Sequence, residues 1–286
     1  MNAWSVWPAP AKLNLFLRIV GRREDGYHLL QTVFRLLDWG DDLHVRLRDD
    51  ERLVGGSGIA EVSPEQDLVL RAAHLLRQHT GCGRGADLRV TKRIPMGGGL
   101  GGGSSDAAST LVALNHLWGT GLSVAELAAL GLQLGADVPV FVHGRSAWAE
   151  GIGERIEPLA LPSASYVIVD PGVHVSTQAF FQSPELTRNA PEATISSFLE
   201  GHATENAFAP LARAAHARID DAMRWLGQFG AARLSGTGAC VFLETETRED
   251  SERIAARCPQ PFRAFVADGV DVSPLRTKVD RSSVGA

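Results

Sequence analysis

Six of the seven residues from 97 to 103 are glycine, and this segment is the clearest sign of chemistry in the sequence. Without side chains the backbone can approach a ligand closely, and a helix starting just after the glycines would add unpaired N–H groups and a positive dipole end. We therefore expect the segment to hold phosphate groups, although a flexible loop or tight turn can have the same composition. The residues expected to contact phosphate are Pro95, Met96, Gly97, Gly98, Gly99, Leu100, Gly101, Gly102, Gly103, Ser104 and Ser105.

The order of residues in this segment excludes other familiar phosphate-binding proteins. A Walker loop places Lys before Ser or Thr, whereas Gly103 is followed directly by Ser104. A dinucleotide-binding fold expects an acidic residue at the end of a second strand about 20 positions later, but Glu126 falls within a predicted helix. The sequence also lacks the His-Arg-Asp and Asp-Phe-Gly motifs of protein kinases.

Three polar residues outside the glycine segment are further candidates. Lys12 and Asn14 share one face of a predicted strand, opposite its apolar face, where they either line a cleft or simply face solvent. Asp137 lies two residues before Pro139, a position at which aspartate commonly starts a turn. Position alone leaves both interpretations open for each residue.

The elements that position these residues follow from apolar spacing. Every second side chain from residue 11 to residue 19 is apolar, which predicts a half-buried strand whose other face carries Lys12, Asn14, Phe16 and Arg18. Residues 27–37 predict a returning strand. A helix should begin near Ser104, with Ser104 or Ser105 as its N-cap. Other elements expected in the first half are strands at 41–47 and 86–94 and helices at 67–78 and 124–134.

The second half mixes strands and helices without regular alternation. The expected elements are strands at 166–169, 232–234 and 240–244 and helices at 177–181 and 211–229. Such an order argues against a doubly wound parallel sheet and favours an α+β fold. A change in composition at 159–165 suggests two lobes, residues 1–160 and 161–286.

Composition excludes several classes of function. A formal net charge of -5 without long runs of like charge gives no general attraction to nucleic acid, and the pairs Arg22-Arg23 and Lys92-Arg93 are interpreted as solvated surface. The three cysteines lack a CxxC pairing, which argues against disulfides or a zinc site and fits a reducing compartment. With neither a secretory signal nor an uninterrupted apolar span, we expect a cytoplasmic protein without a membrane partner.

Three segments resemble the superfamily of galactokinase, homoserine kinase, mevalonate kinase and phosphomevalonate kinase, known as GHMP kinases. They are Pro10-Ala11-Lys12-Leu13-Asn14, the glycine segment, and Leu234-Ser235-Gly236-Thr237-Gly238-Ala239, in the family's order. The last segment either packs against the glycine loop or forms a tight turn between strands. The resemblance implies the two-lobed small-molecule kinase fold of the GHMP type, with an N-terminal α/β lobe, a ferredoxin-like C-terminal lobe and the site between them.

Two further segments are similar to the diphosphocytidyl-methylerythritol kinase branch. They are Gly26-Tyr27-His28-Leu29-Leu30-Gln31-Thr32-Val33-Phe34 and Gly135-Ala136-Asp137-Val138-Pro139. The resemblance implies ATP-dependent phosphorylation of the 2-hydroxyl of the cytidyl substrate, in the non-mevalonate route to isoprenoid precursors. A kinase of another small alcohol, such as homoserine or mevalonate, and a non-catalytic nucleotide-binding regulator are the alternatives.

In that family the residues that match Lys12 and Asp137 form the catalytic pair. An alcohol is a poor nucleophile, so a carboxylate that accepts or orients its proton helps, while an ammonium stabilises developing negative charge. Phosphoryl transfer depends mainly on positioning and charge neutralisation, so Mg²⁺ is expected together with ATP as a cofactor. The chain itself is not expected to hold a metal through a dedicated set of protein ligands.

The resemblance also implies a pocket for the cytidyl end of the substrate. Tyr27 and Phe181 would flank the cytosine ring, with His28 at its polar edge. Phe180 takes the place of Phe181 if the match shifts by one residue. The residues expected to bind substrate are Asn14, Tyr27, His28 and Phe181. The sequence departs from the family at Asp67, where Asn is common near the nucleotide base; a carboxylate there changes how adenine is recognised.

Overall fold

The computed structural model describes residues 3–60 and 62–284, and the strands within these ranges form one mixed sheet. Neighbouring strands follow the order β3-β4-β2-β10-β7-β9-β8, while β1 and β5 also pair with β2, and β6 with β5. The strands are β1 (Ser5–Arg22), β2 (His28–Arg48), β3 (Leu53–Gly56), β4 (Gly85–Thr91), β5 (Ala147–Gly151), β6 (Arg155–Pro158), β7 (Ser165–Asp170), β8 (Arg233–Leu234), β9 (Val241–Thr245) and β10 (Arg263–Val270).

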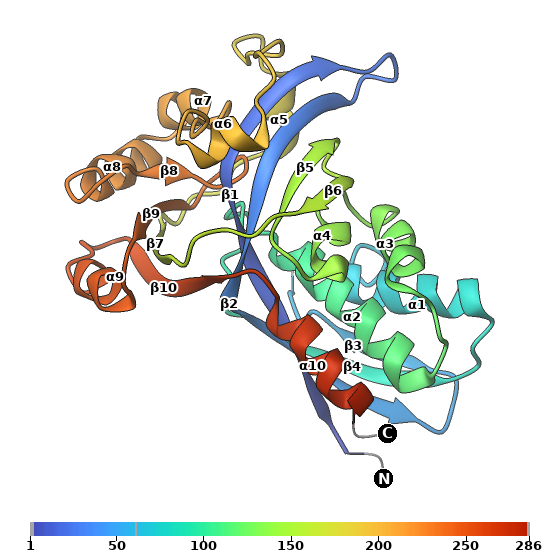
Figure 1. Cartoon of the computed structure of the whole chain (residues 1–286). Coiled ribbons are helices and arrows are strands. Elements are labelled where there is room, and N and C mark those ends of the chain that lie inside the picture. Colours follow the sequence, from blue (N-terminus) through green and yellow to red (C-terminus); the bar gives the residue numbers. More distant parts are fainter. Residues whose placement is uncertain (1–2, 61, 285–286) are drawn as a thin grey trace.

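Helices gather on two sides of this sheet. Figure 1 shows the first four helices on one side of the long β1–β2 pair and α7, α8 and α9 on the other. The helices are α1 (Leu68–Thr80), α2 (Gly102–Trp118), α3 (Val124–Leu132), α4 (Val138–His143), α5 (Thr177–Gln182), α6 (Ile195–Leu199), α7 (Ala209–Ala215), α8 (Ala217–Leu226), α9 (Arg248–Ala255) and α10 (Pro274–Val284). The mixed order confirms the α+β prediction.

The hairpin of β1 and β2 is longer and more buried than the alternation of residues 11–19 predicts. Lys12, Asn14 and Phe16, on the strand face opposite the apolar one, are all buried. The half-buried prediction was wrong because both faces of β1 are covered. Its register against β2 shifts between Asn14 and Leu17, and beyond that point Leu17 and Ile19 pack into the core of the second lobe.

The helix after the glycines starts earlier than predicted. Its N-cap is Gly101, with a left-handed φ of 76° and no capping side chain. Ser105, proposed as a cap, lies inside the first turn, where its backbone N–H donates to the carbonyl of Gly101 at 2.8 Å. The serine-cap prediction was therefore wrong: the residue that must turn the chain into α2 adopts positive φ, which favours glycine.

Asp67, marked as a departure near the nucleotide base, has a structural role. It is the N-cap of α1, and Oδ1 accepts from the backbone N–H groups of Val69 and Leu70 at 2.9 and 3.2 Å. Oδ2 accepts from the backbone and the hydroxyl of Ser57 at 2.8 and 2.6 Å. Both carboxylate oxygens are thus satisfied by the chain itself.

The predicted helix at 211–229 is two helices. His216 adopts an extended conformation (φ -137°, ψ 100°) and is both the C-cap of α7 and the N-cap of α8. This break could not be predicted from the sequence, because the residue types on both sides favour helix. A single extended residue between them also leaves the apolar spacing nearly unchanged.

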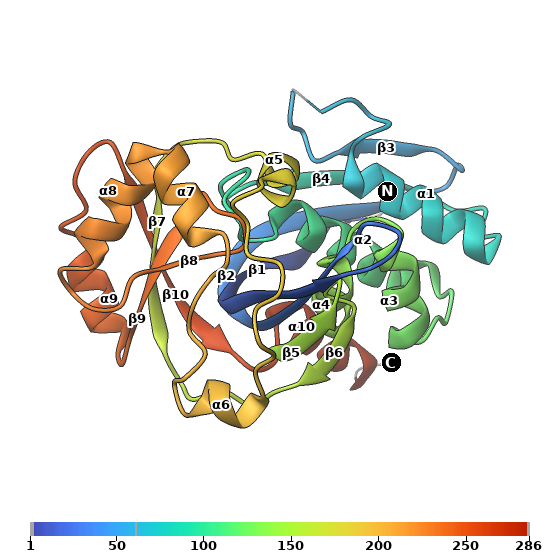
Figure 2. The same ribbon diagram turned by 90° about the horizontal axis from the view of Figure 1, so that it is seen from above.

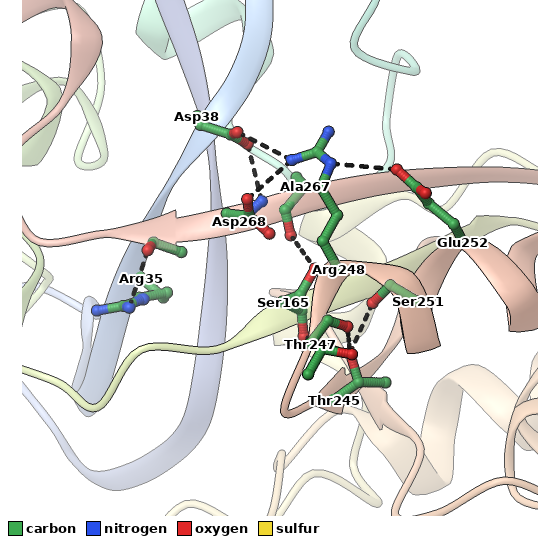
Figure 3. Close-up of polar contacts among 11 residues, drawn as sticks. Arg35, Asp38, Ser165, Thr245, Thr247, Arg248, Ser251, Glu252, Ala267 and Asp268 are labelled. Carbon is green, nitrogen blue, oxygen red and sulfur yellow. Dashed lines mark hydrogen bonds and ion pairs between the residues drawn. The ribbon is translucent and has the colours of Figure 1, made fainter.

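The two halves of the chain meet along β2 and β10. Backbone pairing joins Leu36 to Val270 and Leu37 to Gly269. Beside it, the guanidinium of Arg248, at the start of α9, contacts Asp38 of β2 at 3.1 Å and Asp268 of β10 at 2.9 Å (Figure 3). These contacts connect α9, β2 and β10.

The end of the chain returns to the first half. α10 packs beside the lower part of β1, as Figures 1 and 2 show, and its Leu275 belongs to the core of the first lobe. The division at residues 160 and 161 stays a prediction. Among the helices of the described ranges, none is long and apolar enough to cross a membrane.

Candidate active site

A cavity of about 320 Å³ lies where the two lobes meet. Lys12, Asn14 and Asp137 line it from the first lobe, and Phe181 and Thr237 line it from the second. Segments more than a hundred residues apart in the sequence therefore share one space. Four of the six residues proposed as catalytic or substrate-contacting groups, all but Tyr27 and His28, meet there together with the glycine loop.

Lys12 is held on the floor of this cavity. Its side chain is only 3% exposed, and Nζ donates to the carbonyl of Gly99 at 2.8 Å and to Oδ1 of Asn14. Oδ2 of Asp137 lies 3.5 Å from the same nitrogen. Burial lowers the pKa of Lys12, while the charge of Asp137 and a hydrogen bond to it act in the opposite direction. The ammonium is thus positioned by two fixed acceptors and paired with one carboxylate.

Asp137 is free of the structural role that its position before Pro139 suggested. It stands at the N-cap of α4, but its side chain makes no capping hydrogen bond. The carboxylate points instead to Lys12 and is 35% exposed, which leaves it accessible to a ligand in the cavity. This arrangement favours the chemical interpretation of Asp137 over the turn-forming one.

The orientation of Asn14 is set by a chain of hydrogen bonds. Its Nδ2 donates to Oγ1 of Thr32 at 2.9 Å, and that hydroxyl donates to the carbonyl of Phe16 at 2.6 Å. Because the amide nitrogen is committed to β2, the amide oxygen faces Lys12. Asn14 therefore supplies, beside Gly99, a second fixed acceptor for the ammonium.

The glycine loop keeps its shape through contact with the second lobe. Ser235 Oγ donates to the carbonyl of Gly99 at 2.9 Å, and the backbone N–H groups of Ala239 and Cys240 donate to the carbonyls of residues 97 and 98, both at 3.0 Å. A Cβ on Gly99 would lie 2.1 Å from the carbonyl oxygen of Ser235. The segment 234–239 both packs on the glycine loop and forms a turn, so the two interpretations given for it from the sequence are compatible.

A second cavity of about 330 Å³ lies on the other side of the loop. Residues 95–104 line it together with Ile59, Leu68 and Lys92. The two cavities share Gly97, Gly99, Gly101 and Ser104. A ligand with a chain of phosphates can thus lie in the second cavity and reach the first, with the N-terminus of α2 directed at its negative charge.

A buried charge cluster beside the loop was missed at the sequence level. Lys92, interpreted as solvated surface, is only 22% exposed and contacts Asp41 at 2.5 Å and Asp106 at 2.7 Å. Burial raises the pKa of Asp106 to about 7; the charge of Asp41 acts in the same direction and that of Lys92 against it. No short-range pattern links these residues, which come from β2, from α2 and from the segment after β4.

The aromatic end of the cavity contains Phe181 but not Phe180. Phe180 is buried in the second core with its ring stacked over Phe208, whereas Phe181 lines the cavity. The ring of His28 packs on Phe181 with centroids 5.0 Å apart. Tyr27 is 60% exposed beside them. The substrate-binding roles of these residues stay predictions, and Arg188, which contacts His28, was not anticipated.

The chain is similar to known proteins over nearly its whole length. Residues 67–145 match the family model for the GHMP kinases N-terminal domain, and residues 190–264 match that for the GHMP kinases C-terminal domain. A 4-diphosphocytidyl-2-C-methyl-D-erythritol kinase of Xanthomonas campestris pv. campestris is 56% identical over 283 residues, covering 99% of this chain and 96% of the relative. The chain belongs to the 4-diphosphocytidyl-2-C-methyl-D-erythritol kinase family.

Solved structures agree with membership in this kinase family. A crystal structure of 4-(cytidine 5'-diphospho)-2C-methyl-D-erythritol kinase is 33% identical, with a TM-score of 0.80 over 93% of this chain and 99% of that one. A homoserine kinase from Cytophaga hutchinsonii shares the fold, with a TM-score of 0.64 at 16% identity, covering 93% and 94% of the two chains. The GHMP fold is confirmed, and the chain is a small-molecule kinase with ATP as its phosphate donor.

Proposed function

We propose that this kinase transfers the γ-phosphate of ATP to the 2-hydroxyl of 4-diphosphocytidyl-2-C-methyl-D-erythritol, a step in the non-mevalonate route to isoprenoid precursors. One observation carries the proposal: the ion pair of Lys12 and Asp137 opens into a cavity bounded by the glycine loop on one side and by Phe181 on the other. Phosphate donor, reacting alcohol and aromatic base can therefore occupy one continuous space. The relatives named above support this choice of alcohol.

The residues divide the work of the reaction. Asp137 orients the hydroxyl and accepts its proton as the oxygen attacks, and the ammonium of Lys12 stabilises the negative charge that develops nearby. The backbone N–H groups of the glycine loop and of the first turn of α2 hold the phosphates. Asn14 and Gly99 keep Lys12 in place throughout.

Mg²⁺ is part of the proposal as a companion of ATP. Ser104 lines both cavities and Asp137 is accessible, so oxygen donors of the kind that Mg²⁺ prefers stand beside the loop. When bound, the ion neutralises charge on the phosphates. A cytoplasmic location also belongs to the proposal, supported by three cysteines that are all free.

A coupled assay of ADP release over a panel of alcohols tests the function. The cytidyl compound, homoserine and mevalonate should each be offered with ATP and Mg²⁺. Of the three alcohols, we expect only the cytidyl compound to be turned over, because Phe181 and His28 form an aromatic surface suited to a flat base. Equal turnover of homoserine would assign the chain to another alcohol, and release with none would favour a nucleotide-binding regulator.

A further inference from the structure

Arg188 joins Phe181, which lines the cavity, to His28, whose ring packs on Phe181. Its Nε donates to Nε2 of His28 at 3.1 Å, across 160 positions of sequence. Its Nη2 donates to the carbonyls of Phe181 and Ser183 at 2.9 and 2.7 Å, and its Nη1 to that of Leu186 at 3.0 Å. One guanidinium therefore holds both the end of α5, which carries Phe181, and the imidazole packed against Phe181.

The hydrogen bond between Arg188 and His28 has only one possible direction. A guanidinium has donors and no acceptor, so Nε2 of His28 must accept. A neutral imidazole whose Nε2 accepts carries its proton on Nδ1. Within the described part of the chain, no hydrogen bond reaches that Nδ1. The ring thus keeps one N–H donor for a ligand.

The surroundings also keep this ring neutral. The charged groups that act on it are two cations, Arg188 itself and Arg22 at the end of β1. Partial burial and both positive charges lower the pKa of His28 below its usual value of 6.5. At neutral pH the ring is therefore a neutral, fixed tautomer rather than a mixture of protonation states.

We propose that Arg188 is a positioning residue for base recognition: it fixes His28 as the Nδ1–H tautomer, packed against Phe181, so that His28 offers the substrate base a donor and no acceptor. This inference rests on the proposed function for the identity of the ligand. The recognised atom is then an acceptor on the edge of the pyrimidine ring. Arg188 itself need not touch the substrate.

The tautomer can be measured on the protein alone, without substrate. Two-bond ¹H–¹⁵N spectra of protein labelled with ¹⁵N-histidine distinguish a protonated from an unprotonated ring nitrogen, and a His28→Gln sample identifies the His28 signals. We expect protonated Nδ1 and unprotonated Nε2 from pH 6.5 to 8. A His28 signal with the proton on Nε2, or with the two tautomers averaged, overturns the proposal, and this result needs no Arg188 variant to fold.

Kinetics of Arg188→Met and Arg188→Lys test the consequence for recognition. Arg188→Met keeps an aliphatic chain but removes every donor, and Arg188→Lys keeps the charge without the planar fork. For both variants the KM for the cytidyl compound should rise about tenfold, with kcat and the KM for ATP within twofold of the parent, and the His28 tautomers should average. Arg224→Met removes an exposed arginine paired with Asp220 and serves as the matched control.

The outcomes separate this inference from the proposed function. If the parent protein does not phosphorylate the cytidyl compound but shows the Nδ1–H tautomer, the function fails and the positioning by Arg188 stands. If the parent is active and Arg188→Met leaves both the tautomer and the KM unchanged, the positioning role fails and the function stands. A parallel fall in kcat and in affinity for both substrates would assign Arg188 a structural role only.

Discussion

Replacing Asp137 by Asn removes one negative charge and changes little else. Oδ2 of Asp137 lies 3.5 Å from the ammonium of Lys12, and at an effective dielectric constant of about 20 two such charges attract by roughly 4–5 kcal/mol. An amide can neither accept the alcohol's proton nor supply this charge. We expect kcat to fall by about 10²–10⁴, or roughly 3–5 kcal/mol of barrier, which is the same scale.

Folding of this variant should be affected far less than its chemistry. The carboxylate makes no capping bond to α4, and Lys12 keeps the carbonyl of Gly99 and the amide oxygen of Asn14 as acceptors. The free energy of unfolding should stay within about 2 kcal/mol of the parent. Asp280→Asn, at an exposed carboxylate paired with Arg276 on α10, is the matched control.

The assay is steady-state ADP release with both substrates saturating, together with urea unfolding of each variant. The KM values for ATP and for the cytidyl compound should change little, since the glycine loop and Phe181 are intact. A folded Asp137→Asn protein that loses less than about tenfold in kcat, only ~1.4 kcal/mol, would refute the catalytic role of Asp137.

Three further changes test other parts of the site. Phe181→Ala should raise the KM for the cytidyl compound roughly ten- to hundredfold, whereas Phe180→Ala should instead lower the free energy of unfolding by about 3–5 kcal/mol in urea titrations; the reverse pattern would exchange their roles. Gly99 has a φ of +72°, and a Cβ there would lie 2.1 Å from a carbonyl oxygen, so Gly99→Ala should abolish ATP binding in fluorescence titrations. Gly103→Ala should bind ATP normally, because its Cβ would lie 3.4 Å from a leucine methyl group. Equal affinities of the two variants for ATP would contradict the role of the glycine loop in ATP binding. In the parent protein the pKa of Asp106 is about 7 in the folded state, against 3.8 ordinarily, so the folded chain keeps a proton that the unfolded chain releases, and stability falls as pH rises from about 4 to 7. Urea midpoints of Asp106→Asn measured over this range should lack this part of the pH dependence. A pH dependence equal to that of the parent would contradict the raised pKa of Asp106.

The parts of the fold that could be predicted from the sequence are those with a local cause. The glycine segment, the helix that follows it and the strand carrying Lys12 each have a pattern of residues with one favoured backbone conformation. The burial of Lys12 and Phe16 could not be predicted, because the residues that cover them lie far along the chain: Gly99 and Asp137 at Lys12, and Trp148 and Phe198 at Phe16.

The same distinction applies within the site. That Lys12 and Asp137 lie close together could be predicted only from the resemblance to a family, because no local sequence pattern indicates that β1 and α4 meet. Arg188 and the cluster around Lys92 were missed because their meaning lies in contacts over long sequence separations. Conversely, Asp67 drew attention for its residue type, while its two oxygens are occupied by the cap of α1 and by Ser57.

The position of the new phosphate tests the central claim most directly. The product made from ATP and 4-diphosphocytidyl-2-C-methyl-D-erythritol should be examined by proton-coupled ³¹P NMR. The carbon at position 2 carries the methyl group and no hydrogen, so a phosphate on the 2-hydroxyl should appear as a monoester singlet without three-bond coupling to protons, beside the two diphosphate signals. A monoester signal split by neighbouring protons, or no monoester signal at all, would contradict phosphorylation at that hydroxyl.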